Sequence, residues 1–155
     1  MNLPGEKGMK RIAMSAMLLA LLGAAAVVWA QKRDYSGLAR VQKIYVDDKF
    51  GGNPDGYRFA QLFEEELRKN GFTSVDDPKD ADALATGTLT FMNYTEKSGA
   101  QINLWLKDAQ GHELWNHSYQ DRIKVGEDTV LRCAIHTGKA LRDDKKKALH
   151  GGSWH

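Results

Sequence analysis

The chain has 155 residues, of which 42% are hydrophobic and 27% are charged, an ordinary composition for a globular protein of one domain. Its net charge of +2 belongs to the amino terminus, where Lys7, Lys10 and Arg11 outnumber Glu6. Residues 31–155 therefore hold 19 of the 22 basic residues and 19 of the 20 acidic residues. An electroneutral domain of this kind has no global basic field that would draw nucleic acid.

The amino-terminal segment predicts export. Residues 12–30 carry no charge, follow the basic residues and end in Val28-Trp29-Ala30. This order of basic, apolar and small residues is typical of a secretory signal peptide that is cleaved after Ala30. A retained membrane anchor is the alternative, because the uncharged stretch approaches the ~20 residues that span a bilayer. Lys32 and Arg33 directly after the site also favour retention.

Residues 31–40 are a polar lead-in, and the β-branched and aromatic residues of 41–46 predict a strand. Residues 47–56 hold three glycines and an Asn-Pro step, so a loop is expected there. Residues 57–70 then predict an amphipathic helix, because apolar residues recur every three or four positions.

The end of this helix is also predicted. Gly71 occupies the position at which a left-handed residue closes a helix, and Phe72 follows it. In a Schellman motif the residue after the glycine packs back onto the last turn, here onto Leu67.

Beyond the helix, turn signals alternate with strand signals. Threonine alternates with larger residues over 83–94, and apolar residues alternate with polar ones over 101–107, as in half-buried strands. The predicted strands are residues 73–75, 83–94, 101–107 and 113–122, with turns at 76–82, 96–99 and 108–111.

Asp128 is placed to cap a second amphipathic helix. Two helices over one face of a mixed, mostly antiparallel sheet would bury both apolar stripes, which predicts an α+β fold, a two-layer sandwich. The expected organisation is a signal peptide or anchor helix over 1–30, a lead-in linker over 31–40, the α/β domain over 41–148 and a flexible tail over 149–155.

Several motifs, in this order, resemble one group of bacterial envelope proteins. They are the strand over 41–46, the helix end RKNGF (68–72), the turn and strand DPKDADALATGTL (77–89), the strand pair LWLKDAQGHELW (104–115) and the helix segment LRCAIH (131–136). The group includes the amino-terminal domain of the Tol translocation protein TolB, the curli secretion pore subunit and lipoprotein activators of penicillin-binding proteins. The chain differs from the lipoprotein members in having no cysteine for lipidation near residue 30, and from TolB in that no propeller is expected after the domain.

The resemblance implies a scaffold without an active site. In this fold Gly87 lets another group approach its strand closely, and Trp115 fills the space where the sheet meets a helix. The group's members serve secretion, assembly and activation through protein contacts, and a shared fold does not transfer their partners.

The open face of the predicted sheet is the first candidate binding surface. Trp105 and Tyr119 are expected on it as an exposed aromatic patch, which would mark an interaction site. Lys107 and Arg122 would supply its polar rim. The alternative is a second layer, or the lead-in segment, that covers these rings.

The loop over 47–56 is the second candidate, through the carboxylates of Asp47, Asp48 and Asp55. Carboxylates on a glycine-rich loop can bind calcium, but their spacing does not fit the twelve-residue calcium loop. No metal is therefore predicted. No cofactor is predicted either, because the glycines form neither a phosphate-binding nor a dinucleotide-binding motif.

The remaining reactive side chains predict no chemistry. His112 and His117 are five residues apart, so a regular strand would point them to opposite faces and away from a shared metal. Cys133, the single cysteine, excludes an intrachain disulfide and is expected as a packed thiol.

The sequence thus predicts a non-enzymatic accessory protein of the bacterial envelope, since no set of acid, base and nucleophile is visible. It would be periplasmic or secreted, or anchored in the inner membrane facing the periplasm, and would bind an envelope protein or a cell-wall component. The alternatives are a small-ligand or metal-binding module that uses the loop over 47–56, and a membrane-anchored assembly factor. Contact with a membrane is expected only if residues 12–30 are retained.

Overall fold

The computed structural model describes residues 35–94, 97–123 and 127–151. The predicted signal or anchor segment and the end of the predicted tail lie outside these ranges. Within them, no helix combines the length and the apolar composition needed to cross a membrane.

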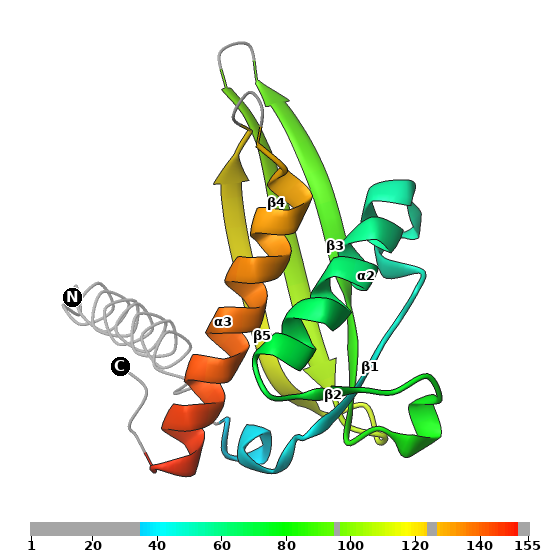
Figure 1. Ribbon diagram of the computed structural model, residues 1–155, viewed down its shortest axis with the longest axis vertical. Coiled ribbons are helices and arrows are strands. Elements are labelled where there is room, and N and C mark those ends of the chain that lie inside the picture. The colour runs from blue at the N-terminus through cyan, green and yellow to red at the C-terminus, as the bar shows by residue number, and fades with distance from the viewer. Residues whose placement is uncertain (1–34, 95–96, 124–126, 152–155) are drawn as a thin grey trace, which may run out of the picture. The chain divides into compact units, whose positions relative to one another are not determined.

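A five-stranded sheet forms one layer of the domain (Figure 1). Its strand order is β2-β1-β3-β4-β5. The strands are β1 (Lys43–Val46), β2 (Thr73–Ser74), β3 (Ala83–Tyr94), β4 (Lys97–Lys107) and β5 (Glu113–Arg122). β1 pairs in parallel with β2 and β3, whereas β3, β4 and β5 form a long antiparallel meander.

Two helices, α2 (Pro54–Lys69) and α3 (Thr129–Leu149), form the second layer. Figure 1 shows them side by side on one face of the sheet. The predicted α+β two-layer sandwich is therefore confirmed. Three short 3-10 helices complete the described chain: η1 (Ser36–Arg40), η2 (Phe50–Gly52) and η3 (Pro78–Asp80).

The core lies between the two layers. Alternate residues of the strands point toward the helices, because successive side chains of a strand face opposite sides. These strand residues meet the apolar stripes of the helices and are nearly or fully buried: Ile44, Val46, Ala85, Leu89, Ile102, Leu104, Leu106 and Trp115 from the sheet, Phe59, Phe63 and Leu67 from α2, and Cys133, Ala134 and Leu141 from α3.

Helix α2 begins three residues earlier than predicted. The amide oxygen of Asn53 accepts a hydrogen bond of 2.8 Å from the backbone N–H of Gly56, and Pro54 is the first helical residue. The Asn-Pro step was interpreted as part of a loop, but asparagine is a preferred N-cap and proline suits the first helical position. The predicted loop over 47–56 is shorter for this reason.

The predicted end of α2 is confirmed. Gly71 has a φ of 86°. The backbone N–H of Phe72 donates to the carbonyl of Leu67 at 2.9 Å, and that of Gly71 donates to the carbonyl of Arg68 at 3.2 Å. These are the two hydrogen bonds of a Schellman motif.

Strand β4 also begins earlier than predicted. Residues 97–99, expected in a turn, belong to the strand, and Gly99 pairs with Met92 on β3 and with Arg122 on β5. A Cβ atom on Gly99 would lie 2.9 Å from the carbonyl oxygen of Asp121. This glycine therefore permits a close approach of two strands, where the sequence suggested a turn.

Part of the predicted lead-in belongs to the domain. Residues 35–40 hold η1, whose Leu38 is fully buried. The hydroxyl of Tyr35 donates to the backbone carbonyl of Asn116 on β5 at 3.4 Å. An apolar anchor and a hydrogen bond thus tie this segment to the outer edge of β5.

Candidate functional site: the open sheet face

The face of the sheet that points away from α2 and α3 is called the open face here. Trp105 of β4 lies on it, between Thr86 of β3 and Asn116 of β5 in the strand register. Its neighbours along the strand, Leu104 and Leu106, are buried on the helix-covered face. Trp105 itself is half-buried, so part of its ring is available to a ligand.

The register builds a grid of three rows around this tryptophan. Each row takes one residue from β3, one from β4 and one from β5, and all nine point away from the helices. The polar grid comprises Thr86, Trp105 and Asn116, then Thr88, Asn103 and Ser118, then Thr90, Gln101 and Gln120.

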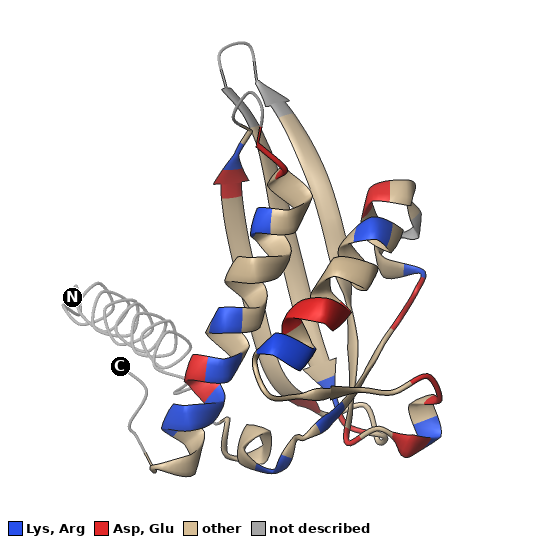
Figure 2. Cartoon of the chain, viewed as in Figure 1, with Lys and Arg blue, Asp and Glu red and all other residues tan. Residues whose placement is uncertain are grey.

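The polar grid contains no charged residue, although 27% of the residues in the chain are charged. Figure 2 shows the same absence of charge along the middle of β3, β4 and β5. Thr88, Thr90, Ser118 and Gln120 are exposed, and the other five are half-buried. The polar grid thus offers hydroxyl and amide groups and one indole, and none of its own side chains is charged.

The two predicted rim residues lie at opposite ends of this face. Lys107 pairs with Leu84 and lies next to the Trp105 row, whereas Arg122 pairs with Gly99 beyond the last row. Six residues of strand separate Trp105 from Gly99, which corresponds to about 20 Å. Lys107 can therefore contact a ligand on Trp105, and Arg122 is too distant to belong to the same contact.

The prediction that Tyr119 shares the open face with Trp105 is wrong. Tyr119 pairs with Ile102, a fully buried residue of the helix-covered face. Its ring stacks on that of His136 from α3, with 3.6 Å between the centroids. A shift of one residue in register moves a side chain to the opposite face, and the sequence alone did not establish how β4 and β5 are aligned.

Tyr119 belongs to an aromatic column instead. Trp115 and His117 precede it on the same side of β5, and their rings stack with 5.4 Å between the centroids. Nε2 of His117 lies 3.3 Å from Nδ1 of His136, so one imidazole donates to the other. The column lies where β5 faces α3, and the sequence did not reveal it because its members come from separate elements.

Partial burial lowers the pKa of both imidazoles, which favours their neutral forms. It lowers the pKa of His117, His136 lowers it further, and Asp144 opposes the shift. Burial also lowers the pKa of His136, which Asp121 raises in part and Lys139 lowers. When both rings are neutral, the N–H group of one can donate to the bare nitrogen of the other, so the two histidines can be in contact at neutral pH.

This pair predicts a loss of stability in acid. Because the pKa values are lowered in the folded state, the unfolded chain takes up protons first as the pH falls below about 6.5. We expect the free energy of unfolding to be level well above the unfolded pKa of histidine, about 6.5, and to decrease as the pH falls below it. Urea denaturation across this range should show a weaker decrease in His136→Gln than in the wild type. Parallel curves would contradict the prediction.

The predicted acidic loop does not bring its carboxylates together into a site. Asp47 accepts a hydrogen bond from the backbone N–H of Lys49 at 3.0 Å, Asp48 is exposed, and Asp55 lies in the first turn of α2. Across the described residues, no three histidine, cysteine or acidic side chains converge as metal ligands. The predicted His112 lies apart from this loop, in the turn between β4 and β5, where its Nδ1 lies 3.0 Å from Oδ2 of Asp108.

Cys133 is a buried free thiol, as predicted. Burial raises the pKa of this thiol to about 11. The thiolate, which is the nucleophilic form, is therefore scarce at neutral pH. Cys133 packs in the core and has no role at the open face.

The start of α3 is fixed at the far end of the sheet. Asp128 is its N-cap, as predicted: one carboxylate oxygen accepts from the backbone N–H of Leu131 at 3.1 Å, and the other pairs with Arg58 of α2. The cap therefore also joins the two helices.

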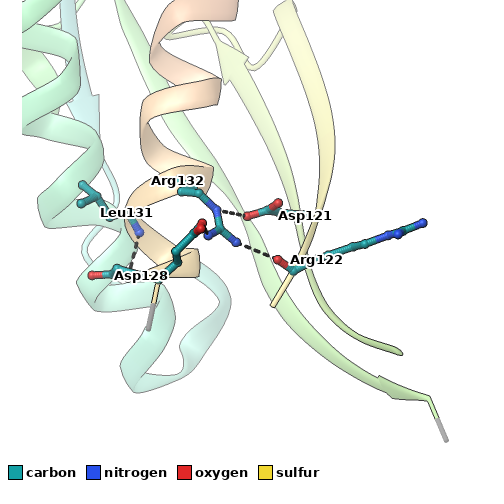
Figure 3. Close-up of polar contacts among 6 residues, drawn as sticks. Asp121, Arg122, Asp128, Leu131 and Arg132 are labelled. Atoms are coloured by element: carbon teal, nitrogen blue, oxygen red, sulfur yellow. Dashed lines mark hydrogen bonds and ion pairs between the residues drawn. The ribbon is translucent and has the colours of Figure 1, made fainter. Parts of the chain in front are cut away.

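An arginine that the sequence did not single out connects α3 to β5. Figure 3 shows Arg132 reaching across to the end of the strand. Its Nε donates to Asp121 at 2.6 Å, a terminal nitrogen donates to the backbone carbonyl of Arg122 at 2.7 Å, and the guanidinium also pairs with Glu127. These contacts fix the end of β5 and with it the last row of the polar grid.

The comparisons with known proteins concern the fold. No family model and no curated protein matches the chain. A solved structure of a PelC variant from Paraburkholderia phytofirmans, described as a dodecamer, aligns with a TM-score of 0.50 at 16% identity, over 65% of this chain and 85% of that one. A second PelC dodecamer from the same organism gives a TM-score of 0.45 at 12% identity, over 72% and 88%.

A DUF4136 family protein from Bacteroides thetaiotaomicron gives a TM-score of 0.44 at 11% identity, over 77% of this chain and 94% of that one. The solved structures that resemble the chain thus include bacterial PelC and DUF4136 proteins. The PelC variant with a TM-score of 0.50 shows a shared fold, and at 16% identity this likeness transfers no activity or partner.

Proposed function

We propose that this chain is a non-enzymatic protein of the bacterial envelope that works by binding, with its ligand on the open face of the sheet. The observation that carries this proposal is the half-buried Trp105 at one end of an uncharged polar grid. The export-like segment over 12–30 supports a periplasmic or secreted protein, or one anchored in the inner membrane. The resemblance to TolB, the curli subunit and the activator lipoproteins supports an envelope role.

The chemistry of the face favours binding over catalysis. The side chains of the polar grid are amides, hydroxyls and one indole, which donate and accept hydrogen bonds without titrating near neutral pH. General acid–base catalysis needs a group whose pKa lies near the working pH. The two histidines that contact each other, His117 of β5 and His136 of α3, lie on the other side of the sheet.

Photo-crosslinking in intact cells tests the proposal. A photoreactive amino acid at the exposed Thr88 should yield adducts with envelope material, and the same amino acid at Gln61, which is exposed on α2, should not. Trp105→Ala should abolish the Thr88 adducts. Tyr57→Ala is the matched control, because Tyr57 is 51% exposed and lies on α2, away from the open face. Adducts that form equally in Trp105→Ala would contradict the proposal.

Self-assembly is a second candidate function, favoured by the edge of the sheet. β5 is its last strand and carries no charged residue over 114–120. Tyr35 occupies the carbonyl of Asn116, and the uncharged edge beyond it, around Ser118, is a template for pairing with another chain. The PelC structures with this fold are described as dodecamers. Native mass spectrometry of the full chain should then show oligomers that Ser118→Lys dissociates. A monomer at tens of micromolar would exclude this function.

A further inference from the structure

Resting on the proposed function, we propose that the ligand of the open face is a neutral glycan strand, an uncharged polymer of sugar rings. The first argument is charge. None of the nine residues of the polar grid is charged. The nearest charges are Glu113, whose carboxylate accepts a hydrogen bond from the amide of Asn116, and Lys107, which pairs with Glu113 in the register, whereas Arg122 lies beyond the other end of the grid. The two charges at the Trp105 end have opposite signs, so the grid presents no net charge with which to attract an ionic ligand or to neutralise one.

The second argument is the composition of the face. Protein–protein interfaces draw most of their binding energy from clusters of tryptophan, tyrosine and arginine, and serine and threonine are under-represented among these residues. The polar grid shows the reverse, with a single aromatic residue among three threonines, a serine, two asparagines and two glutamines. Its inventory matches a ligand that is itself rich in hydroxyl groups.

The third argument is that the polar side chains at the centre of the grid are already positioned. The hydroxyl of Ser118 donates to Oδ1 of Asn103 at 2.8 Å, and Nε2 of Gln101 donates to the same oxygen at 3.2 Å. Neither bond uses the NH2 group of Asn103, which is left as a donor for a ligand. Side chains that are ordered before binding cost less entropy when the ligand arrives.

The fourth argument is the place of Trp105. An indole combines a large apolar face with a polar edge, and the apolar C–H face of a sugar ring can pack on it while the sugar hydroxyls reach the neighbouring amides. The rows of Trp105, Asn103 and Gln101 follow one another at every second residue of β4, so the grid extends about 14 Å along the strand. That length favours several sugar units of a chain over a single monosaccharide.

Retention on fractionated envelope glycans tests the inference. The probe is the neutral polysaccharide fraction of the producing cell's envelope, freed of protein by protease and immobilised, with the acidic fraction beside it. The full chain should be retained on the neutral fraction only. Trp105→Ala should weaken retention roughly 10-fold, as expected for a central aromatic contact, and Tyr57→Ala should not change it.

Asn103→Asp is the second variant, because it keeps the size of the side chain and replaces the NH2 donor by an oxygen. It should weaken retention several-fold with an unchanged melting temperature.

Equal retention of the wild type and both variants, or no retention on the neutral fraction, would overturn the inference. If the Thr88 crosslinks then prove to be protease-sensitive and to depend on Trp105, the ligand is a protein and only the glycan is excluded. If no crosslink depends on Trp105, the proposed function fails as well.

Discussion

Trp115→Ala is expected to lower the free energy of unfolding by about 3–5 kcal/mol, the usual cost of removing a fully buried tryptophan. The side chain is 0% exposed and fills the space between β5 and α3. Its indole N–H also donates to the carboxylate of Asp144 on α3 at 3.0 Å, so truncation leaves a cavity and removes one of the two hydrogen bonds that the carboxylate accepts, the other coming from Lys147. Urea denaturation of the full chain measures the loss.

Two further variants separate the contributions. Trp115→Phe keeps a buried ring and removes the donor, so it should cost about 1.5–3 kcal/mol, the usual value of a hydrogen bond to a charged group. Trp105→Ala, on the half-buried side of the same sheet, should cost less than Trp115→Ala. A loss below about 1 kcal/mol for Trp115→Ala would show that the domain can close the cavity.

Gly87→Ala has the second largest expected effect. A Cβ atom at this position would lie 2.2 Å from the backbone oxygen of Asn103 and 2.5 Å from the ring of Phe50. Phe50 is 1% exposed and its ring lies 4.8 Å from that of Phe59, so it cannot swing away freely. We expect a loss of about 3 kcal/mol, at the upper end of the usual cost of overpacking a core.

The neighbouring Thr88→Ala is the control, because Thr88 lies on the same strand with an exposed side chain. It should change stability by no more than about 1 kcal/mol, the span of strand propensities. Equal losses of unfolding free energy in the two variants would mean that the strand tolerates a side chain at Gly87. The close approach of Phe50 would then not limit the size of the residue at this position.

The sequence predicted those parts of the fold that depend on local chemistry. The strand over 83–94 was predicted from its alternation and has the same bounds as β3. The close of α2 was predicted from Gly71, because a left-handed glycine after an apolar helix has few other uses. Gly87 and Trp115 were also interpreted correctly, since the lack of a side chain and a very large side chain each constrain packing.

The errors in the candidate site arose where separate elements of the fold meet. Trp105 was placed on the open face and lies there, but its predicted partner Tyr119 does not, because the alignment of β4 with β5 fixes the face. The histidine pair and the contacts of Arg132 were missed for the same reason.

The position of β1 has a consequence for the order in which the chain folds. β1 lies between β2 and β3, and its partners lie about 30 to 40 residues downstream, where Lys43 pairs with Thr73 and Ile44 with Ala83. By contrast, β3, β4 and β5 pair with their immediate neighbours in sequence, which closes much shorter loops. We expect the meander to form first and β1 to be inserted last. If the chain crosses a membrane with its amino terminus leading, β1 would therefore stay unpaired until the strands of the meander have followed.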